Sequence, residues 1–441
     1  MSHKIGIRRE TKPGERRTPL TPIAVKQLKE EHNILTILQP FDKRAFSDEE
    51  YKEAGALINE DLSDCSVVFG IKEMDLDIFL PDKAFMCFHH VIKGQESNMP
   101  MLKHIMKTGS TMLDYEKITD DKNRRLIFFG RHAGYAGMID TLHGFGLRLK
   151  EMEGLDSPFL KIKQSCDYFD LKEAKEEIAK VAEIIKKDGL PYNLFPLVFG
   201  FLGYGNVSQG AQMILDLLPV KEIAPDELAE LCACPDVDEC KTTIYKVVFK
   251  EEDMVKPKDA SAKFVLQDYY DHPEKYEGCF AEEYLEHITV IVNGAYWSDK
   301  YPKSITKEDI KELYCGDKEP RLRFIGDISC DVEGGVEATV RISYIERPFF
   351  CYDPEEDTAT DGVKGSGPAI LAIDHLPTEI PRDASEYFSN TLLPFVPNIA
   401  KANYNGTLDE AGLAEEIKKS VILWKGKFTP NYEYIGDYLE D

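Results

Sequence analysis

Short apolar runs alternate with amphipathic segments along the first 135 residues. The runs "KIGIRRE", "ILTILQP", "SVVFGIKE", "AFMCFHH" and "TMLDYE" resemble buried strands, and "TPIAVKQLKEEH", "SDEEYKEAGA" and "MPMLKHIMKTG" have the apolar spacing of helices. Strands that alternate with helices require crossover connections and form a parallel sheet. The pattern therefore predicts an α/β fold for this part of the chain.

A second α/β unit is expected to follow. A helix should run from Asp170 to Gly189, because its apolar residues recur with helical period between a capping aspartate and a glycine stop. Apolar "LFPLVFGFLGYG" leads into helical "NVSQGAQMILDLL", and "VKEIAP", "HITVIVNGAYW" and "RLRFIGDIS" are expected to be strands. A last helical region begins near Arg382. The sequence thus predicts two Rossmann-like domains with parallel sheets and a cleft between them.

Composition and charge narrow the classes of partner. The chain has 441 residues, 43% of them hydrophobic, which favours two domains over one. Its formal net charge of -25 argues against nucleic acid or an anionic membrane as a partner. No apolar run reaches the roughly 18 residues that span a bilayer, and no signal peptide is evident. We expect a soluble cytoplasmic protein that holds small anionic ligands with a few placed cations.

The ten cysteines are scattered, so we expect no disulfide framework. The segment "CACPDVDEC" places Cys232, Cys234 and Cys240 close together, but it lacks a fourth ligand and the usual C-x2-C spacing of a zinc site. We interpret it as a surface loop of reduced thiols and expect no bound metal.

A glycine-rich turn joins the buried strand to the helix in "GFLGYGNVSQG". Gly203 allows a tight turn and Gly205 allows a phosphate to approach, while the third glycine position of G-x-G-x-x-G is Ser208. Backbone amides at such a helix start bind pyrophosphate. We expect this turn, with Asn206 and Val207, to bind a dinucleotide; the alternative is a purely structural turn.

The choice of nicotinamide cofactor depends on the strand after that helix. The tip of "VKEIAP" is expected at Ala224, beside the adenosine ribose. Glu222 lies one pleat earlier and Asp226 lies beyond, so neither carboxylate need face the ribose. Lys241 or Lys246 could reach a 2′-phosphate only if the loop folds back. We favour NADP(H), with NAD(H) as the alternative.

Charged residues end several strands of the first domain. They are Arg17, Lys72, Glu73, His90, Lys93, Glu116 and Arg125. In open parallel sheets the ligand crevice lies outside the carboxyl ends of the strands, so these side chains could converge. The alternative is that each is a solvated charge at a strand end, and His89, on the opposite strand face from His90, is expected to be structural.

Chemistry suggests a role for each member of this set. His90 and a desolvated Lys72 form the natural acid/base pair. The forks of Arg17 and Arg125 suit the carboxylates of a dicarboxylic substrate. The two glutamates, Glu73 and Glu116, could receive a substrate ammonium or tune neighbouring pKa values.

The motifs also carry a family resemblance. "RRETKPGERRTPLTP", "FGIKE", "FHHVIKGQESNM", "LDYEKITDDKNRRLIFFGRHAGYAG", "GNVSQGA", "GDISCD" and "AIDHLPTEIPRDASEYFSNTLLP" resemble the saccharopine-forming lysine–ketoglutarate reductases and the lysine-forming saccharopine dehydrogenases. The chain is more distantly similar to alanine dehydrogenase and the N-terminal part of transhydrogenase. The resemblance implies a substrate domain of residues 1–135 and 381–441, with a dinucleotide-binding domain of residues 136–380 inserted between them.

The resemblance also implies roles for residues. The family's acid/base pair falls on Lys72 and His90, its carboxylate-binding arginines on Arg17 and Arg125, and its supporting charges on Lys93, Glu73 and Glu116. Asp331 and Asp374 are implied to line the cofactor and substrate crevice. Arg131 and His132 depart from the family pattern and could alter access to the cleft.

The implied reaction joins L-lysine to 2-oxoglutarate and reduces the imine with a nicotinamide hydride, giving saccharopine. The similarity to lysine–ketoglutarate reductases also favours NADP(H). The saccharopine-cleaving half of the bifunctional enzymes is expected to be absent from this chain, so a separate enzyme could supply that activity. An alanine-type amino-acid dehydrogenase and a non-catalytic nucleotide-binding relative are the alternatives, and the mitochondrial matrix is the alternative compartment.

Overall fold

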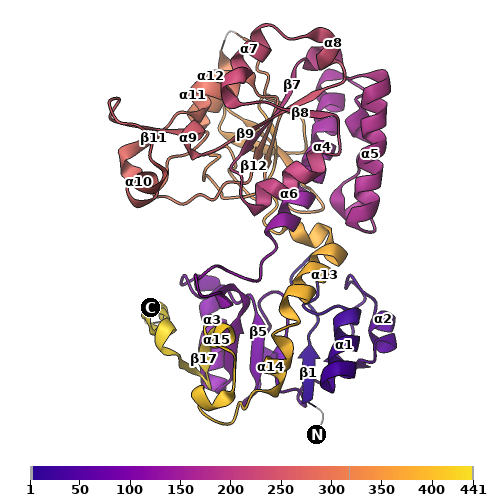
Figure 1. Cartoon of the computed structure of the whole chain (residues 1–441), viewed down its shortest axis with the longest axis vertical. Coiled ribbons are helices and arrows are strands. Elements are labelled where there is room, and N and C mark those ends of the chain that lie inside the picture. The colour runs from indigo at the N-terminus through magenta and orange to yellow at the C-terminus, as the bar shows by residue number, and fades with distance from the viewer. Residues whose placement is uncertain (1–2, 317, 440–441) are drawn as a thin grey trace. The chain divides into compact units, whose positions relative to one another are not determined.

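The chain forms two compact units. The computed structural model describes residues 3–316 and 318–439. One unit combines Met1–Phe129 with Pro381–Asp441, and the other is the continuous stretch Gly130–Ile380. Each unit has its own eight-stranded sheet with helices packed against it (Figure 1). The chain therefore leaves the first unit once and returns to it once.

The sheet of the first unit is parallel across its centre. Its strands are His3–Ile7 (β1), Ile34–Leu38 (β2), Leu57–Ile58 (β3), Val67–Phe69 (β4), Ala84–Cys87 (β5), Thr111–Asp114 (β6), Val421–Trp424 (β17) and Lys427–Phe428 (β18). They lie in the order β18-β17-β6-β5-β4-β1-β2-β3. β1 to β6 pair in parallel, while β17 pairs antiparallel to β6. The predicted parallel sheet is present, and the C-terminal part of the chain extends it.

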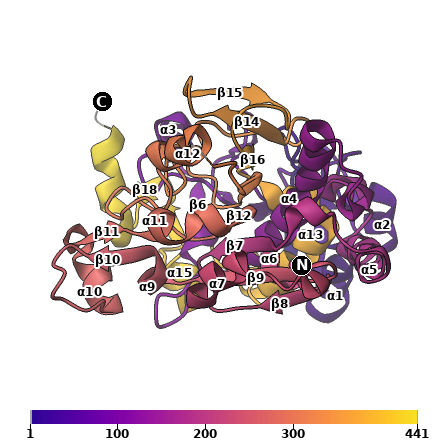
Figure 2. The ribbon, with the colours of Figure 1, turned by 90° about the horizontal axis from the view of Figure 1, so that it is seen from above.

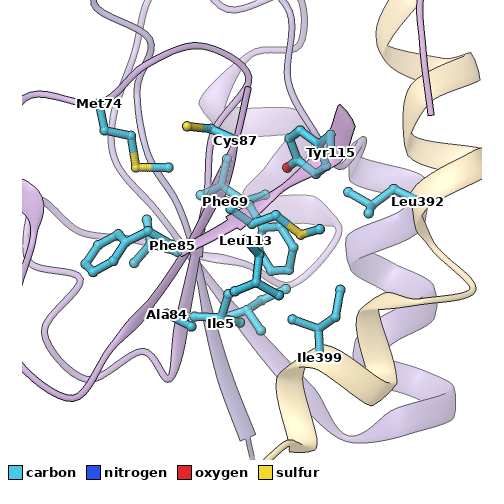
Figure 3. Close-up of a cluster of buried hydrophobic side chains, with 14 of the residues drawn as sticks. Ile5, Phe69, Met74, Ala84, Phe85, Cys87, Leu113, Tyr115, Leu392 and Ile399 are labelled. Atoms are coloured by element: carbon cyan, nitrogen blue, oxygen red, sulfur yellow. The ribbon is translucent and has the colours of Figure 1, made fainter. Parts of the chain in front are cut away.

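Helices from both ends of the chain cover this sheet. They are Pro22–His32 (α1), Asp48–Glu53 (α2), Met99–Thr108 (α3), Pro381–Leu392 (α13), Val396–Lys401 (α14) and Glu415–Lys418 (α15). Figure 3 shows side chains of the sheet, such as Ile5, Phe69 and Leu113, gathered with Leu392 and Ile399 of α13 and α14. All five are fully buried. The C-terminal segment is therefore part of the core of the first unit.

The second unit has a parallel sheet with an antiparallel edge. Its strands are Leu197–Leu202 (β7), Val220–Glu222 (β8), Ile244–Phe249 (β9), Val290–Asn293 (β12), Phe324–Asp327 (β13), Phe349–Asp353 (β14), Thr358–Asp361 (β15) and Ala369–Leu371 (β16). The order is β15-β14-β16-β13-β12-β7-β9-β8. β14 and β15 form an antiparallel hairpin that Figure 2 shows at one edge.

Helices and a small hairpin surround the second sheet. The helices are Gly130–Glu153 (α4), Leu171–Asp188 (α5), Asn206–Leu215 (α6), Leu228–Ala233 (α7), Val237–Cys240 (α8), Glu251–Met254 (α9), Leu266–Asp271 (α10), Phe280–Tyr284 (α11) and Lys307–Cys315 (α12). The hairpin pairs Val255–Pro257 (β10) with Tyr276–Gly278 (β11). The prediction for α5 is confirmed: the Asp170 carboxylate accepts from the Glu173 amide at 2.8 Å, and Gly189 ends the helix at φ 86°.

The sequence pattern does not predict β9, and this strand changes the order of the sheet. β9 pairs with β7 along its whole length, from Leu197 opposite Ile244 to Leu202 opposite Phe249. β8 pairs with the other side of β9. Ala224, the expected tip of "VKEIAP", therefore follows a strand that is separated from β7 by β9.

The described part of the chain adds three observations on ligands and partners. No helix within it is long and apolar enough to cross a membrane. No three His, Cys, Asp or Glu side chains within it gather as metal ligands. Its ten cysteines are free thiols, with Cys234 exposed and Cys240 buried in the segment "CACPDVDEC".

Candidate active site

A buried ion pair fixes the loop that follows β4. Arg8 and Glu10 are bonded to each other at 3.0 Å, and both side chains are 2% exposed. Arg8 also donates to the carbonyl oxygens of Lys72 at 2.7 Å and Glu73 at 2.6 Å. Glu10 accepts from the backbone amides of Ile71 at 2.7 Å and Lys72 at 3.0 Å. Because these bonds hold the backbone from both sides, the fold determines where the Lys72 and Glu73 side chains begin.

His90 and Glu73 form a hydrogen-bonded pair. His90 follows β5 in a left-handed conformation at φ 50°, its carbonyl oxygen accepts from the Asn98 side chain at 3.2 Å, and its Nδ1 bonds the Glu73 carboxylate. Burial raises the pKa of Glu73, but the bond and charge of His90 outweigh it and lower the pKa to about 2. Glu73 is thus ionised at neutral pH and orients Nε2 of His90 as the nitrogen for a ligand. Lys93, three residues later, is exposed.

The ammonium of Lys72 lies among other cations. Burial lowers its pKa, and the positive charges of Arg17 and Lys12 lower it further. The carboxylates of Glu15 and Glu73 oppose this shift without reversing it. Lys72 therefore loses its proton more readily than an ordinary lysine, as a general base requires.

Arg17 is already engaged by a carboxylate of the same unit. Its Nε and Nη2 donate to the two carboxylate oxygens of Glu15 at 2.8 and 2.6 Å, and both residues are buried. Burial raises the pKa of Glu15, but the charge and bonds of Arg17 bring it to about 2. The guanidinium also lies 4.3 Å from the centre of the Phe129 ring. The predicted free clamp at Arg17 is thus occupied along one edge of its fork.

Arg125 is more open and lies against the ring of Phe88. Its Nη1 is 3.1 Å from the carboxylate of Glu116, its Nε donates to the Ile127 carbonyl at 3.0 Å, and its side chain is 38% exposed. The guanidinium lies 5.3 Å from the ring centre of Phe88, which stacks on the ring of His90 at 6.2 Å. Arg125 and His90 therefore contact the same aromatic ring, that of Phe88.

An aromatic cluster connects the two arginines. Phe88 lies 6.1 Å from Phe129, which stacks at 4.8 Å on Phe388 from α13. Arg17 covers one end of this cluster and Arg125 the other. The first unit thus brings together six of the seven predicted charged residues around one apolar floor, and a ring from the C-terminal segment forms part of that floor.

Asp114 braces the loops after β5 and β6. Its buried carboxylate accepts from the backbone amides of His89 at 3.0 Å and Glu116 at 2.8 Å. Burial raises the pKa of Asp114 to about 6. His89 is fully buried, and loss of hydration lowers its pKa to about 4. His89 is therefore a structural residue, in agreement with the expectation from the sequence.

The glycine turn of the second unit has the space that a phosphate needs. Gly203 has φ 83°, and a Cβ there would lie 3.0 Å from the backbone of Ala295. A Cβ on Gly205 would meet no atom within 4 Å. The ten-residue helix α6 then begins at Asn206 with no side chain bonded to its cap, and Val207 is half-buried behind it. These features fit the pyrophosphate of a dinucleotide.

Two helices touch behind this turn. A Cβ on Gly134 of α4 or on Gly210 of α6 would collide with backbone atoms of the facing helix. Arg131, in the first turn of α4, donates to the side chain of Gln209 at 3.3 Å, and His132 is buried. Of the two residues that depart from the family pattern, Arg131 therefore takes part in the contact between α4 and α6, and His132 packs against Tyr135 of its own helix.

Two predicted aspartates flank a half-buried cysteine. Cys330, at φ 57° after β13, donates to the Ala372 carbonyl at 3.0 Å. Burial raises the pKa of this thiol, and the negative charges of Asp331 and Asp374 contribute to the shift. Asp374 is bonded to His375, and both aspartates are exposed. The structure thus brings Asp331 and Asp374 to neighbouring strand ends.

The two lysines considered for a 2′-phosphate lie elsewhere. Lys246 points from the middle of β9 and is bonded to Asp216 at 2.8 Å and Glu222 at 3.0 Å, with 6% of its side chain exposed. Lys241 lies before the amino end of β9, whereas Phe249 is at the carboxyl end of this strand. Neither lysine lies at the carboxyl end of the sheet, where nucleotides bind in folds of this class.

Three carboxylates of the first unit were not predicted from the sequence. Glu10 and Glu15 lie in the arginine-rich stretch "RRETKPGERR", and Asp114 ends an apolar strand. Glu10 and Glu15 could have been predicted, because each lies within two positions of an arginine in the sequence. Asp114 carries no comparable signal, because its partners are backbone amides of distant loops.

Comparisons with known proteins agree with this architecture. The family described as "Alanine dehydrogenase/PNT, N-terminal domain" matches residues 6–136. The "Alpha-aminoadipic semialdehyde synthase" of Arabidopsis thaliana is 38% identical over 447 residues, covering 98% of this chain and 41% of that protein. The "Saccharopine dehydrogenase [NAD(+), L-lysine-forming]" of Emericella nidulans is 27% identical, covering 89% of this chain and 91% of that protein.

A solved structure supports the fold. An L-alanine dehydrogenase superposes with a TM-score of 0.61 at 15% identity, covering 99% of both chains. At this identity the likeness concerns the fold, which is α/β with two parallel-rich sheets as predicted. The chain spans less than half the length of the Arabidopsis relative.

Proposed function

From the premise that the chain is homologous to the alpha-aminoadipic semialdehyde synthases and the saccharopine dehydrogenases, we propose that it joins L-lysine to 2-oxoglutarate and reduces the product to saccharopine. The ε-amine of lysine attacks the ketone carbon, one water leaves, and a hydride and a proton add to the resulting C=N bond. The reaction is reversible, and the enzyme is an oxidoreductase of lysine metabolism.

The observation that carries the proposal is the group Lys72, Glu73 and His90. Lys72, with its lowered pKa, takes the proton that the substrate ammonium must lose before its nitrogen attacks. His90 gives a proton to the hydroxyl that leaves as water, and the ionised Glu73, bonded to Nδ1, orients the ring. Each proton therefore has a donor or acceptor in one small group.

The substrate carboxylates need cations, and we assign this role chiefly to Arg125, with the exposed Lys93 as a further cation of the same unit. Arg125 is partly exposed and adjoins the ring that stacks on His90. Arg17 reaches a ligand only through the part of its fork that Glu15 leaves open. We assign to Arg17 a second role, which is to lower the pKa of Lys72. Glu116 orients Arg125.

We propose NADP(H) as the cofactor, with NAD(H) as the alternative. Residues 203–207 would hold the pyrophosphate, because the turn is open above Gly205 and the amides of α6 are uncapped. Asp331 and Asp374 would line the same crevice. When bound, the nicotinamide supplies the hydride, and residues of this chain position the substrate and move the protons.

The test measures the consumption of NADPH by the purified chain, which is monitored as the loss of NADPH absorbance. We expect oxidation that requires both L-lysine and 2-oxoglutarate, with saccharopine as the product by mass spectrometry. The second candidate is an alanine-type dehydrogenase, which the family match to residues 6–136 favours. Oxidation with pyruvate and ammonia, and none with lysine and 2-oxoglutarate, would replace the first proposal with the second.

We further propose that saccharopine passes to a separate saccharopine-cleaving enzyme. We also propose that the protein acts in the cytoplasm, with the mitochondrial matrix as the alternative. Fractionation of cells that express the protein, with the activity measured in each fraction, distinguishes the two.

A further inference from the structure

The residues that follow His90 form a tight turn. His90 has φ 50°, in the left-handed region that a residue with a side chain adopts at an energetic cost. The amide of Gly94, at φ 68°, donates to the Val91 carbonyl at 3.1 Å and closes the turn. A residue in such a conformation keeps it only where its surroundings hold the chain. The Asn98 side chain holds the His90 carbonyl at 3.2 Å, and the turn itself needs further contacts.

The helical segment Pro430–Leu439 supplies contacts to this turn. The hydroxyl of Tyr434 donates to the Ile92 carbonyl at 3.0 Å. The ring of Tyr438, further along the same segment, covers Gly94 so closely that a Cβ there would lie 2.5 Å from a ring carbon. Two tyrosines from the C-terminal part of the first unit therefore contact the turn, one through its hydroxyl and one through its ring.

The segment that carries these tyrosines is anchored independently of them. Ile435 is fully buried in the core of the first unit, and the Tyr432 hydroxyl donates to the Lys419 carbonyl at 2.6 Å. Tyr434 and Tyr438 are 44% and 46% exposed, so they contribute little to that core. Substitution of either tyrosine should therefore loosen the turn and leave the unit folded.

We infer that Tyr434 and Tyr438 are positioning residues for His90. They hold residues 91–94 and thereby keep His90 in the left-handed conformation in which its Nδ1 meets the Glu73 carboxylate. Without them the backbone of His90 relaxes toward an extended conformation, and its ring leaves Glu73. The inference rests on the proposed function only in using the turnover of that reaction as one of its two measurements.

The first measurement is steady-state turnover of variants that separate the hydroxyl from the ring. Tyr434→Phe removes the bond to Ile92 and should lower kcat about 3- to 10-fold, the scale of one neutral hydrogen bond. Tyr438→Ala removes the ring over Gly94 and should lower kcat by about tenfold. Tyr438→Phe keeps the ring and should restore kcat to within about twofold of the parent. The Kd of NADPH should stay within about twofold throughout, because the glycine turn belongs to the other unit.

The second measurement is hydrogen–deuterium exchange by mass spectrometry, which does not depend on activity. In Tyr434→Phe and in Tyr438→Ala, the peptide of residues 89–98 should exchange faster, because the bond from the Gly94 amide opens more often. Tyr404→Phe is the matched control. It removes a hydroxyl that donates to the Ile399 carbonyl at 2.9 Å in the same unit, and it should change neither kcat nor the exchange of this peptide.

Two results would overturn the inference. One is unchanged exchange of residues 89–98 in both Tyr434→Phe and Tyr438→Ala. The other is a loss of kcat in Tyr404→Phe as large as in these variants, which would mean that turnover follows the stability of the unit. A parent protein that forms no saccharopine would overturn the proposed function instead, and the exchange experiment would still decide whether the tyrosines hold the turn.

Discussion

The neighbours of Lys72 and His90 affect different properties of these residues: the pKa of Lys72 and the orientation of the His90 ring. Burial and two cations lower the pKa of Lys72, whereas His90 is oriented by an ionised Glu73. We expect Lys72→Met and His90→Ala each to lower kcat by about 10²-fold or more, the usual scale for an acid/base group. Lys103→Met, at an exposed lysine of α3, is the control and should leave kcat nearly unchanged. Steady-state kinetics and circular dichroism check this, and near-normal turnover in either variant would contradict the assignment.

The charge of Lys12 should appear in the pH profile. Lys12 helps to lower the pKa of Lys72, so Lys12→Gln removes one repulsion and the Lys72 pKa should rise. Because the base acts in its neutral form, the rise of kcat with pH should move to higher pH. A series of kcat measurements across pH checks this. A shift to lower pH would show that another group sets the profile.

Substitutions of Arg125 and Arg17 should affect different measured quantities. Arg125→Ala should raise the KM for 2-oxoglutarate by about tenfold or more, because it removes a partly exposed cation. Arg17→Ala should lower both kcat and the free energy of unfolding, since it leaves the buried Glu15 carboxylate without its partner. Kinetics and thermal unfolding of the two variants separate the roles. An equal rise in KM, with no loss of stability, would restore the clamp at Arg17.

At the scale of elements, the contact between α4 and α6 depends on glycine. A methyl group on Gly134 would collide with the backbone of α6, so Gly134→Ala should lower the free energy of unfolding by about 1 to 3 kcal/mol. It should also weaken NADPH binding, because α6 begins at the glycine turn. Gly436→Ala is the control, since its nearest neighbour would lie 3.8 Å away. Equal melting temperatures for the two variants would contradict this view of the contact.

Elements with local signals could be predicted from the sequence, and the order of strands could not. The ends of α5 follow from Asp170 and Gly189, and the strand before Gly203 follows from its apolar run. β9 follows the cysteine-rich loop and carries a buried lysine, Lys246, so its alternation is less clear. A right-handed crossover is compatible with two arrangements: β8 can pair with β7 directly, or β9 can lie between them. The crossover rule therefore does not determine the order of these strands.

Some residues of the candidate site could likewise be predicted from the sequence, and others could not. Lys72, His90 and Glu116 were candidates from the sequence because each closely follows an apolar run. The pairing of Arg17 with Glu15 could not be predicted, because a nearby carboxylate and a substrate carboxylate offer the guanidinium the same bonds. Arg8 and Glu10 act on a loop more than 60 residues away, which no local pattern records.

At the scale of the whole molecule, the two units differ in how the chain builds them. Gly130–Ile380 is continuous and has its own core, so this segment alone should unfold cooperatively and bind NADPH. Residues 1–129 alone should not fold, because α13, α14 and β17 complete their core and sheet. Thermal unfolding by circular dichroism and calorimetry of both fragments check this. A stable fragment of residues 1–129 would contradict it.

The return of the chain to its first unit has a consequence for synthesis on the ribosome. β6 emerges early, yet β17, its partner at the outer edge, is translated about 300 residues later. At usual elongation rates, roughly 5 to 20 residues per second, this edge waits for tens of seconds while the inserted unit is made. During that wait an apolar strand edge is open to other nascent chains. Chaperones that cover the N-terminal half of the nascent protein should therefore influence its yield more than those that act on the finished chain.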